Sequence, residues 1–469
     1  MPTFPLDPGD IVRMKRWLAT QNTDTAHPLR PIGIEEILIG ADVLPQLPAV
    51  IERAGVADGA TVVLVMDTVP MRRGEQDLKP FVAALLRDAG YGVETLWLEG
   101  DRYGLVHADF TQVERVRAAL RPDVALVALG SGTVTDIAKH AAYLYDQEQQ
   151  EQKPVVYICC QTANSVTAFA ANMAVLLKDG VKRTILSRYP TAIISDQRVL
   201  ASAPTAMTLA GLGDCCARFV AYGDWYLASA LGLVDFYSEV PLALLANLEA
   251  VLTAHAVTIG QRTLEGEAVV ARALLLAGIA QSIVNMSAPI SGTEHVISHV
   301  LDMIADSYQR GLALHGAQVG VATLTAARLY QHFLNTFDPR TLNLDSCYPT
   351  DTAMQPHIQQ LFSSIDPAGA MAQECWSDYA TKLALWRQNR PRFVEFCNHW
   401  QDKHRPKLAS LVSSPDAVHT ILAQAGAPLA PQDLVPSISQ EEYDFAIHNG
   451  HFIRQRFVLG DLLYFVGSG

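Results

Sequence analysis

The sequence has few charged residues, and the two signs are unevenly balanced. Asp, Glu, Lys and Arg make up 18% of the 469 residues, and 35 Lys and Arg against 48 Asp and Glu leave a net charge of −13. An acidic surface repels a phosphate backbone, which argues against nucleic acid as the main partner. A small anionic substrate remains compatible with this charge, because a pocket can be locally positive on an acidic protein.

Cysteine is scarce, and its pattern excludes a disulfide framework. The seven cysteines are odd in number, two pairs are adjacent (Cys159-Cys160 and Cys215-Cys216), and no Cys-x-x-Cys occurs. This is not the pattern of a disulfide-rich secreted domain or a thiolate zinc site, so we expect a reducing, cytoplasmic location. We find neither the layout of a signal peptide at the start nor a run of about 18 uncharged apolar residues, and therefore predict no membrane span.

Apolar residues, by contrast, are abundant. They make up 49% of the chain, which excludes a disordered protein and supplies a large core for two or three domains. In the first 200 residues, short apolar segments alternate with helix-like stretches such as 76–89 and 111–120, a pattern that predicts a parallel sheet covered on both faces. The segments that we expect to be strands are 34–39, 62–66, 94–98, 124–129, 155–158 and 191–195.

After Asp196 the strand pattern fades, and from about residue 204 Ala and Leu recur with helical spacing. We therefore predict an α/β domain over 1–200 and an all-α domain over 201–469. Within the second, segment 336–372 is rich in Pro, Asn, Asp and Ser and predicts a loop-rich insertion. The stretches that we expect to be helical are 239–258, 266–285, 317–335 and 440–466.

A glycine-rich turn, Gly130-Ser131-Gly132-Thr133, follows the fourth predicted strand and leads through Thr135-Asp136 into a helix. Glycines let a backbone approach a ligand closely, and the N–H groups of a helix N-terminus suit a phosphate. The pattern is not a complete G-x-G-x-x-G, since Thr135 stands where the third Gly would be. Taken alone, the pattern fits a tight turn that binds no ligand equally well. Its place at the carboxyl end of a strand favours pyrophosphate binding.

Two histidines four residues apart, His295 and His299, share one face of a predicted helix, and His315 follows just before a glycine. Such a pair fits a metal site, but the motif is not H-E-x-x-H, because Glu294 precedes the first His and would point elsewhere. A polar helix face is the commoner reading of a lone H-x-x-x-H.

Asp214 lies in an otherwise apolar helical stretch, where a carboxylate is costly to bury unless it is paired or bound to metal. A helix cap is the alternative, for Asp214 and for Asp224. The loop 159–175, just after the strand 155–158, carries Thr and Ser hydroxyls that suit either a cofactor site or an ordinary polar turn.

These four segments, in this order and spacing, resemble the metal-dependent, iron-containing alcohol dehydrogenase superfamily, and most of all its sn-glycerol-1-phosphate dehydrogenase branch. The resemblance runs from IGIEEILIGADVLPQL at 32–47 to HFIRQRFVLGDLL at 451–463, and GTEHVISH with the later His-Gly is its most specific part. It implies a dehydroquinate synthase-like fold, in which a nicotinamide-binding α/β domain and an all-α metal-binding domain enclose the active site.

The resemblance implies a reaction linked to NAD or NADP at one divalent metal, for which zinc is our expectation and iron or nickel are the alternatives. It makes Asp214, His295 and His315 the metal ligands, a three-ligand site with open positions. His299 matches a residue near the nicotinamide and the substrate. The positions that match the family's cofactor contacts are Asp67, Gly130, Ser131, Gly132, Thr133, Asp136, Thr162 and Ser165.

The chain departs from the branch near the substrate. Thr167 replaces an acidic residue, Gln161 replaces a Pro on the same loop, and Arg218 stands where the branch usually has Lys. We expect Thr167 and Arg218 to contact the substrate, and the substrate rather than the reaction class to have changed. Lys182 and Arg183 either bind an anionic group of the substrate or are solvated surface.

The expected activity interconverts a small polar alcohol, with or without a phosphate group, and its ketone or aldehyde. One alternative is a dehydroquinate synthase-like lyase or cyclase, but that branch has a Lys-rich phosphate site and a Glu where Asp214 stands. The other is a non-catalytic binding homologue, against which the complete ligand set argues. We expect a homo-oligomer, a dimer, whose partners are small molecules.

Overall fold

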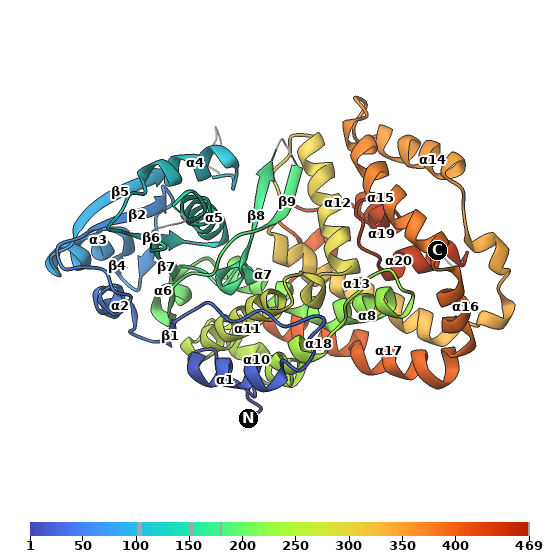
Figure 1. Ribbon diagram of the computed structural model, residues 1–469, viewed down its shortest axis with the longest axis horizontal. Coiled ribbons are helices and arrows are strands. Elements are labelled where there is room, and N and C mark those ends of the chain that lie inside the picture. Colours follow the sequence, from blue (N-terminus) through green and yellow to red (C-terminus); the bar gives the residue numbers. More distant parts are fainter. Residues whose placement is uncertain (101–105, 150–152, 179–180, 468–469) are drawn as a thin grey trace. The chain divides into compact units, whose positions relative to one another are not determined.

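The computed structural model describes residues 1–100, 106–149, 153–178 and 181–467 (Figure 1). Its central feature is a six-stranded sheet in the order β1-β10-β7-β6-β2-β5, in which every pairing is parallel. Each of its strands overlaps one of the six predicted segments, which confirms the predicted parallel sheet. The strands are β1 (Glu36–Gly40), β2 (Thr61–Asp67), β5 (Gly92–Leu98), β6 (Val124–Gly130), β7 (Val156–Gln161) and β10 (Ala192–Asp196).

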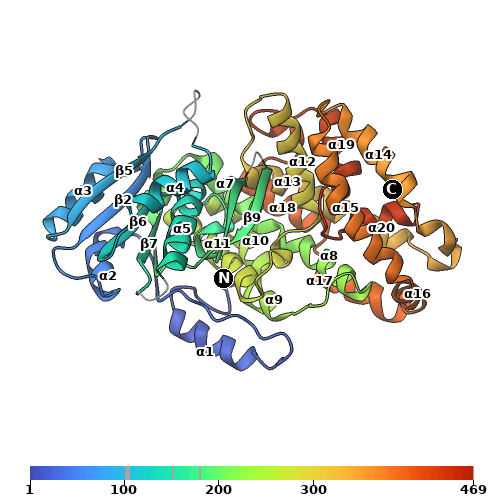
Figure 2. The same ribbon diagram turned by 45° about the horizontal axis from the view of Figure 1, so that its top comes forward.

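Helices cover both faces of this sheet (Figures 1 and 2). On one face α2 (Leu47–Arg53) and α3 (Leu78–Asp88) bury their apolar side chains against alternate residues of β2 and β6. The other face contacts α5 (Gly132–Glu148), on which α4 (Phe110–Ala119) packs. The central strands are apolar throughout because both faces are buried, which is why their sequence does not alternate.

Two antiparallel hairpins were not expected from the sequence. One is β3 (Arg72–Arg73) with β4 (Gln76–Asp77), and the other is β8 (Met173–Lys178) with β9 (Val181–Leu186). Among residues 173–177 of β8, Ala174 and Leu176 are fully buried and the other three are partly buried, so this part of the strand lacks the continuous buried run that marks the central strands.

The chain forms two compact units, and each is interrupted in sequence. Unit 1 comprises Met1–Cys215 with Val240–Met286, and unit 2 comprises Cys216–Glu239 with Ser287–Gly469. This division differs from the boundary that we predicted near residue 200, because three helices of 12, 13 and 20 residues from beyond that point pack in the unit of the sheet. They are α7 (Thr205–Cys216), which ends at the boundary, α10 (Leu248–Gly260) and α11 (Leu264–Ile283). The remaining helices of unit 1 are α1 (Ile11–Gln21), α6 (Gln197–Ser202) and α9 (Val240–Leu244).

Two stretches of unit 1 are long and apolar enough to cross a bilayer by composition, Val240–Gly260 and Leu264–Ile283. The second is α11, and 94% of it is buried inside the protein, as in a core helix. The first is the predicted helix 239–258, which the structure divides into α9 and α10 at Asn247, where φ is 67°. Neither stretch is more than weak evidence for a membrane span.

Unit 2 is helical in the part of the chain that the structure describes, as predicted. Segment 336–372, expected to be loop-rich, contains α14 (Asp351–Ser363), which is capped by Thr350 and buries Met354, Ile358 and Phe362 at a spacing of four residues. The other helices are α8 (Arg218–Ala230), α12 (Thr293–Ser307), α13 (His315–Thr336), α15 (Ala370–Gln388), α16 (Arg390–Asn398), α17 (Arg405–Leu411), α18 (Pro415–Ala425), α19 (Gln440–Asn449) and α20 (Leu459–Phe465).

Candidate active site

Three predicted cofactor positions meet at the carboxyl edge of the sheet. Asp67 ends β2, Gly130 ends β6, and Thr162 follows β7, where its backbone N–H donates to the Gly130 carbonyl oxygen across 3.1 Å. Ligands of open α/β sheets bind at this edge. The structure therefore brings Asp67, the glycine turn and the loop after β7 to the edge that the nucleotide-binding interpretation requires.

At the glycine turn the backbone of α5 begins without a side-chain cap. Ser131 is the N-cap residue, yet its hydroxyl accepts no hydrogen bond from the first turn, and Thr133 is only partly buried. The uncapped N–H groups suit an anionic ligand. Gly132 has a second role, because a Cβ there would lie 2.5 Å from Cγ2 of Val166 on the neighbouring loop.

Asp67 is paired with a lysine that the sequence analysis missed. Its Oδ1 accepts hydrogen bonds from the Val69 backbone N–H (3.0 Å) and from Lys79 Nζ (2.9 Å), and both charged side chains are about nine-tenths buried. Lys79 also lies over the Trp97 ring, 5.4 Å from its centroid. The carboxylate that we predict near the adenosine ribose is therefore partly neutralised.

Asp136, a predicted cofactor contact, also has partners within the protein. Its Oδ1 accepts from Lys139 Nζ (3.1 Å) and its Oδ2 from the Val175 backbone N–H (3.2 Å), so its carboxylate joins α5 to β8. Lys139 is fully buried and also donates to the carbonyl oxygens of Ala168 (2.6 Å) and Met173 (2.9 Å). This pair fixes the 3-10 turn Thr167–Ala170 in the loop after β7.

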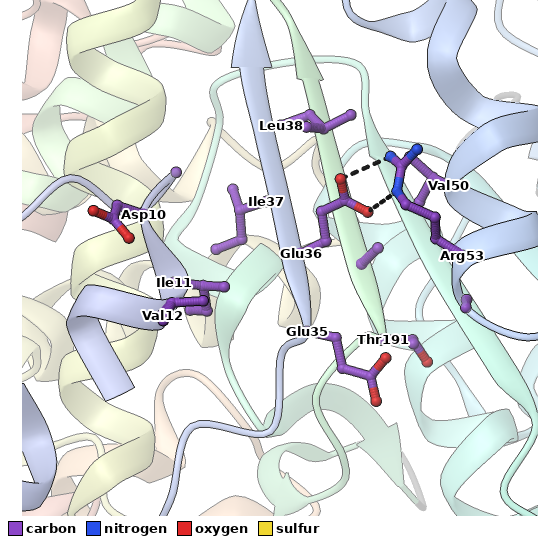
Figure 3. A pocket seen from close by; sticks show the side chains of 13 residues that line it. Asp10, Ile11, Val12, Glu35, Glu36, Ile37, Leu38, Val50, Arg53 and Thr191 are labelled. Carbon is purple, nitrogen blue, oxygen red and sulfur yellow. Dashed lines mark hydrogen bonds and ion pairs between the residues drawn. The ribbon is translucent and has the colours of Figure 1, made fainter. Parts of the chain in front are cut away.

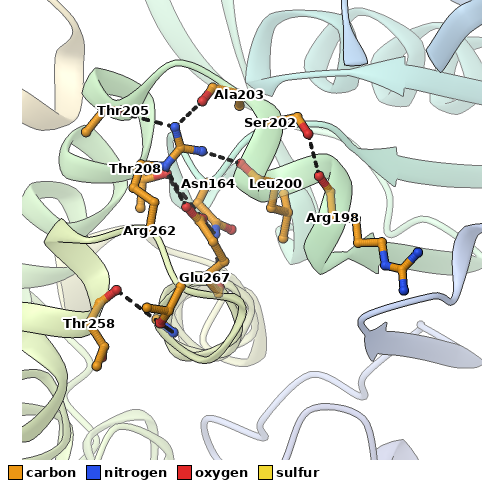
Figure 4. A network of polar contacts seen from close by, with 12 residues as sticks. Asn164, Arg198, Leu200, Ser202, Ala203, Thr205, Thr208, Thr258, Arg262 and Glu267 are labelled. Carbon is orange, nitrogen blue, oxygen red and sulfur yellow. Dashed lines mark hydrogen bonds and ion pairs between the residues drawn. The ribbon is translucent and has the colours of Figure 1, made fainter. Parts of the chain in front are cut away.

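The loop after β7 is held by a buried polar network, and Figure 4 shows the part of it formed by Asn164, Glu267 and Arg262. Gln161 accepts from the Ser195 hydroxyl (2.7 Å) and donates to Asn164 Oδ1 (2.9 Å), and Asn164 donates to Glu267 Oε2 (2.7 Å). Glu267 is fully buried and is paired with Arg262 at 2.9 Å. The departure at Gln161 is therefore part of the internal support of the loop and does not add a polar group for a substrate.

Asp214 is held by the same loop. It lies in the last turn of α7 and is 3% exposed, and its Oδ2 accepts a hydrogen bond from the Thr167 backbone N–H across 2.8 Å. A carboxylate at this end of a helix does not act as its N-cap, so the helix-cap alternative is wrong for Asp214. Thr162, Ser165 and Thr167 are all more than nine-tenths buried.

In unit 2 the three predicted histidines form one cluster. His295 and His299 lie on α12, and His315 is the first residue of α13. The ring centroids of His295 and His315 are 5.2 Å apart, those of His299 and His315 are 5.8 Å apart, and those of His295 and His299 are 6.3 Å apart. The spacing of the motif therefore does bring three imidazoles together.

Glu294 contacts His295, contrary to the expectation that it points elsewhere. Its Oε1 lies 2.8 Å from His295 Nδ1 and also accepts from the Gly292 backbone N–H (2.6 Å). An ionised carboxylate only accepts hydrogen bonds, so this contact places the ring proton of His295 on Nδ1 and leaves Nε2 as its ligand atom.

His315 is oriented by a hydroxyl and an amide. Ser298 Oγ lies 3.1 Å from His315 Nδ1 and donates its proton to Gln318 Oε1 across 2.8 Å, while Gln318 Nε2 donates to Asp302 Oδ1 (3.0 Å). Because Ser298 has one proton, it must accept from His315 Nδ1, which again leaves Nε2 as the ligand atom. The sequence analysis missed Ser298 and Gln318, although each lies three residues after a predicted ligand and thus on its helix face.

The structure describes the elements that carry the remaining substrate candidates. Arg218 is the first residue of α8 and is partly exposed, and Arg183 lies on β9. The side chain of Lys182 lies outside the described residues. Asp224, which we considered as a helix cap, lies within α8 and bonds to the N-termini of two other helices, at Thr293 and Leu459.

The cavity shown in Figure 3 is not part of this site. It has a volume of 460 Å³ and lies along β1, between the first turn of α1 and α2, where Arg53 pairs with Glu36. Its lining includes Glu35 and Thr191, which precede β1 and β10, so it reaches the amino edge of the sheet. No predicted site residue lines it.

The chain is similar to known proteins in both sequence and structure. The family model for iron-containing alcohol dehydrogenases matches residues 38–204. The NAD(P)+ glycerol-1-phosphate dehydrogenase of Bacillus subtilis (strain 168) is 30% identical over 327 residues, which are 68% of this chain and 79% of that protein.

Two solved structures show the same fold. The alcohol dehydrogenase from Oenococcus oeni has a TM-score of 0.53 at 13% identity, covering 93% of this chain and 98% of its own. Sulfoacetaldehyde reductase from Bifidobacterium kashiwanohense, solved with NAD+, has a TM-score of 0.52 at 15% identity, covering 92% and 95%. The sequence matches show that this chain belongs to the iron-containing alcohol dehydrogenase family.

Proposed function

We propose that this chain is a metal-dependent, NAD(P)-linked oxidoreductase that interconverts a small polar alcohol and its ketone or aldehyde. The observation that carries the proposal is the orientation of His295 and His315. The Nδ1 of each ring faces its own oxygen partner, Glu294 or Ser298, so that both rings keep Nε2 as the ligand atom. Metal-binding histidines are oriented by outer partners in this way.

The donor set fits a divalent ion. Asp214 offers a carboxylate oxygen and His295 and His315 offer imidazole nitrogens, and the first two of these residues are buried. Asp214 lies two residues before the chain passes from unit 1 into unit 2, which holds both histidines. Three protein ligands with positions left for substrate are typical of a catalytic metal. Nitrogen and oxygen donors suit zinc, iron and nickel alike. We propose zinc as the bound ion, and metal analysis of the purified protein decides among the three.

The chemistry divides between the bound groups and the protein. When bound, a divalent ion supplies a Lewis acid and the nicotinamide exchanges the hydride. The protein binds and orients: the first turn of α5 presents N–H groups to the cofactor pyrophosphate, and Glu294 and Ser298 hold the ligand rings. We assign His299 to hold or pass the proton of the substrate hydroxyl, because it lies beside both ligand rings and an imidazole titrates near neutral pH.

The relative from Bacillus subtilis acts on glycerol-1-phosphate by its name. For this chain we propose a related small polar alcohol or ketone as the better substrate, because Thr167 offers one neutral hydroxyl where the branch has a carboxylate. Since Gln161 belongs to the internal network, this part of the proposal depends on Thr167 alone.

A spectrophotometric assay tests the reaction class. Purified protein with metal, NAD+ or NADP+ and a panel of polyols and polyol phosphates is followed at the absorbance of reduced nicotinamide. Net reduction supports the oxidoreductase, product without net reduction supports the lyase alternative, and cofactor binding without either supports a binding protein. A cytoplasmic location and a homodimer belong to the same proposal, and light scattering during gel filtration tests the latter.

A further inference from the structure

The carboxylate of Asp224 joins four helices of unit 2. It lies on α8 and is 1% exposed. Its Oδ2 accepts a hydrogen bond from the Thr293 backbone N–H of α12 (2.5 Å), and its Oδ1 accepts from the Tyr330 hydroxyl of α13 (2.6 Å) and from the Leu459 backbone N–H of α20 (2.8 Å). The Thr293 hydroxyl also donates to Oδ1 (3.2 Å). One side chain thus fixes the start of two helices and the side of a third.

The contact with α12 lies directly beside a proposed metal ligand. Thr293 is the first residue of α12, and His295 is in the same turn. The first N–H groups of a helix have no partner within the helix, so an outside acceptor decides how this turn is held. Here Asp224 accepts from Thr293, while Glu294 accepts from Gly292 and orients His295.

The backbone is adapted to this carboxylate. A Cβ on Gly292 would overlap Oδ2 of Asp224, so a glycine is required just before α12. Both carboxylate oxygens accept from donors, and an asparagine would turn its NH₂ group toward one of them. A buried carboxylate is costly, and a core residue without charge would fill the space at lower cost. The chain keeps this carboxyl group where it holds the turn that carries Glu294 and His295.

We propose that Asp224 is a positioning residue of the metal site, which holds the first turn of α12 so that the Glu294–His295 pair faces the ion. The inference depends on the proposed function in one respect, that His295 is a ligand. The competing explanation is that Asp224 only stabilises the fold of unit 2. The two explanations differ in whether a substitution of Asp224 lowers the metal affinity beyond what the loss of fold stability accounts for.

Asp461 provides a matched control. It is a fully buried carboxylate of the same unit, and it caps the same helix α20 by accepting from the Val458 backbone N–H across 2.9 Å. Its partner is Lys382 at 2.8 Å. Among the described residues, the hydrogen bond and the ion pair of Asp461 involve neither α12 nor α13, so its loss perturbs the unit without touching the turn of His295.

The experiment compares Asp224→Asn, Asp461→Asn and Tyr330→Phe with the wild-type chain. Zinc affinity of the full-length apoprotein is measured by competition with a chromogenic chelator, and the melting temperature of each apoprotein is measured alongside. We expect Asp224→Asn to weaken zinc binding about 10- to 100-fold, the usual effect of losing an outer partner of a metal ligand. Asp461→Asn should stay close to the wild-type zinc affinity at a similar loss of melting temperature. Tyr330→Phe, which removes one donor and leaves both backbone contacts, should lie between them.

Equal zinc affinities for Asp224→Asn and Asp461→Asn would overturn the inference. If Asp224→Asn does not fold, Tyr330→Phe carries the test, and wild-type zinc affinity in that variant would overturn the inference. The proposed function is tested separately by His295→Ala in the same assay. Wild-type zinc affinity in His295→Ala would reject the ligand assignment itself, whereas loss of binding in His295→Ala with no effect of Asp224→Asn would reject the positioning role alone.

Discussion

The backbone N–H of Thr167 donates a hydrogen bond to the carboxylate of Asp214, with 2.8 Å between N and Oδ2. The predicted substrate loop and a proposed metal ligand are thus joined through the main chain. Lys139 also supports this turn, by donating a hydrogen bond to the Ala168 carbonyl oxygen. Because the backbone makes the contact with Asp214, the side chain at position 167 can change without removing it.

Substrate choice is the first prediction. Wild-type protein should turn over dihydroxyacetone phosphate with a kcat/KM below about 10⁴ M⁻¹s⁻¹, the lower end of the ordinary enzyme range, and should act faster on a related small ketone or aldehyde. Thr167→Asp should raise the relative kcat/KM for dihydroxyacetone phosphate, since a carboxylate accepts hydrogen bonds from substrate hydroxyls. Thr167→Ser is the control. If dihydroxyacetone phosphate is the best substrate of the wild-type protein, with a kcat/KM above about 10⁴ M⁻¹s⁻¹, the proposed change of substrate is wrong.

The glycine turn gives the second prediction. Gly132→Ala alone would displace Val166. The double variant Gly132→Ala/Val166→Ala removes that overlap and leaves only the obstruction of the cofactor pyrophosphate. We expect the double variant to melt close to the Val166→Ala control and to bind the nicotinamide cofactor more weakly by calorimetry, with unchanged metal content. Cofactor affinity equal to that of the control would show that the pyrophosphate lies elsewhere.

The Asp67–Lys79 pair predicts cofactor choice. With Lys79 partly neutralising the carboxylate, the wild-type chain should use both NAD and NADP. Lys79→Met should favour NAD by at least about tenfold, the effect of 1.4 kcal/mol, because an unpaired carboxylate repels the 2′-phosphate of NADP. Asp67→Asn/Lys79→Met should reverse this shift. The ratio of kcat/KM for the two cofactors is the measurement, and a ratio that stays the same in both variants would place Asp67 away from the ribose.

The pH dependence of stability follows from a buried histidine. His140 on α5 is 4% exposed and stacks on Tyr143, and burial lowers its pKa to about 4. The unfolded chain binds this proton from about pH 6.5 downward and the folded chain only near pH 4, so stability is lost as the pH falls between these values. Between pH 7.5 and pH 4.5, we expect the free energy of unfolding in urea to fall by about 2–3 kcal/mol less in His140→Leu than in the wild-type protein. An identical loss in both proteins would mean that His140 is not buried as described.

The four inner strands of the sheet, β10, β7, β6 and β2, could be read from the sequence because a strand covered on both faces is a continuous apolar run. The hairpin of β8 and β9 could not, since its burial alternates and depends on what packs against it. Apolar content predicted one helix over 239–258, but left-handed Asn247 interrupts it.

At the candidate site, too, some features could be predicted from the sequence and others could not. Family resemblance, rather than spacing, predicted Asp214 together with His295 and His315, because the ligands lie far apart in sequence. Adjacent residues on a helix point in different directions, which led us to direct Glu294 away from His295. In the first turn of α12 the Glu294 side chain instead folds back to the Gly292 N–H. Gln161 supports the loop through Ser195, Asn164 and Glu267, and contacts between residues so far apart in sequence are not visible in a local pattern.

Metal analysis of His295→Ala and His315→Ala tests the central claim most directly, with His332→Ala as the control on an exposed position of α13. The account predicts about one divalent ion per chain in wild type and in His332→Ala. It predicts little bound metal and almost no nicotinamide-linked turnover in the other two variants. Near-normal metal content in both His295→Ala and His315→Ala would contradict the metal site and the mechanism that depends on it.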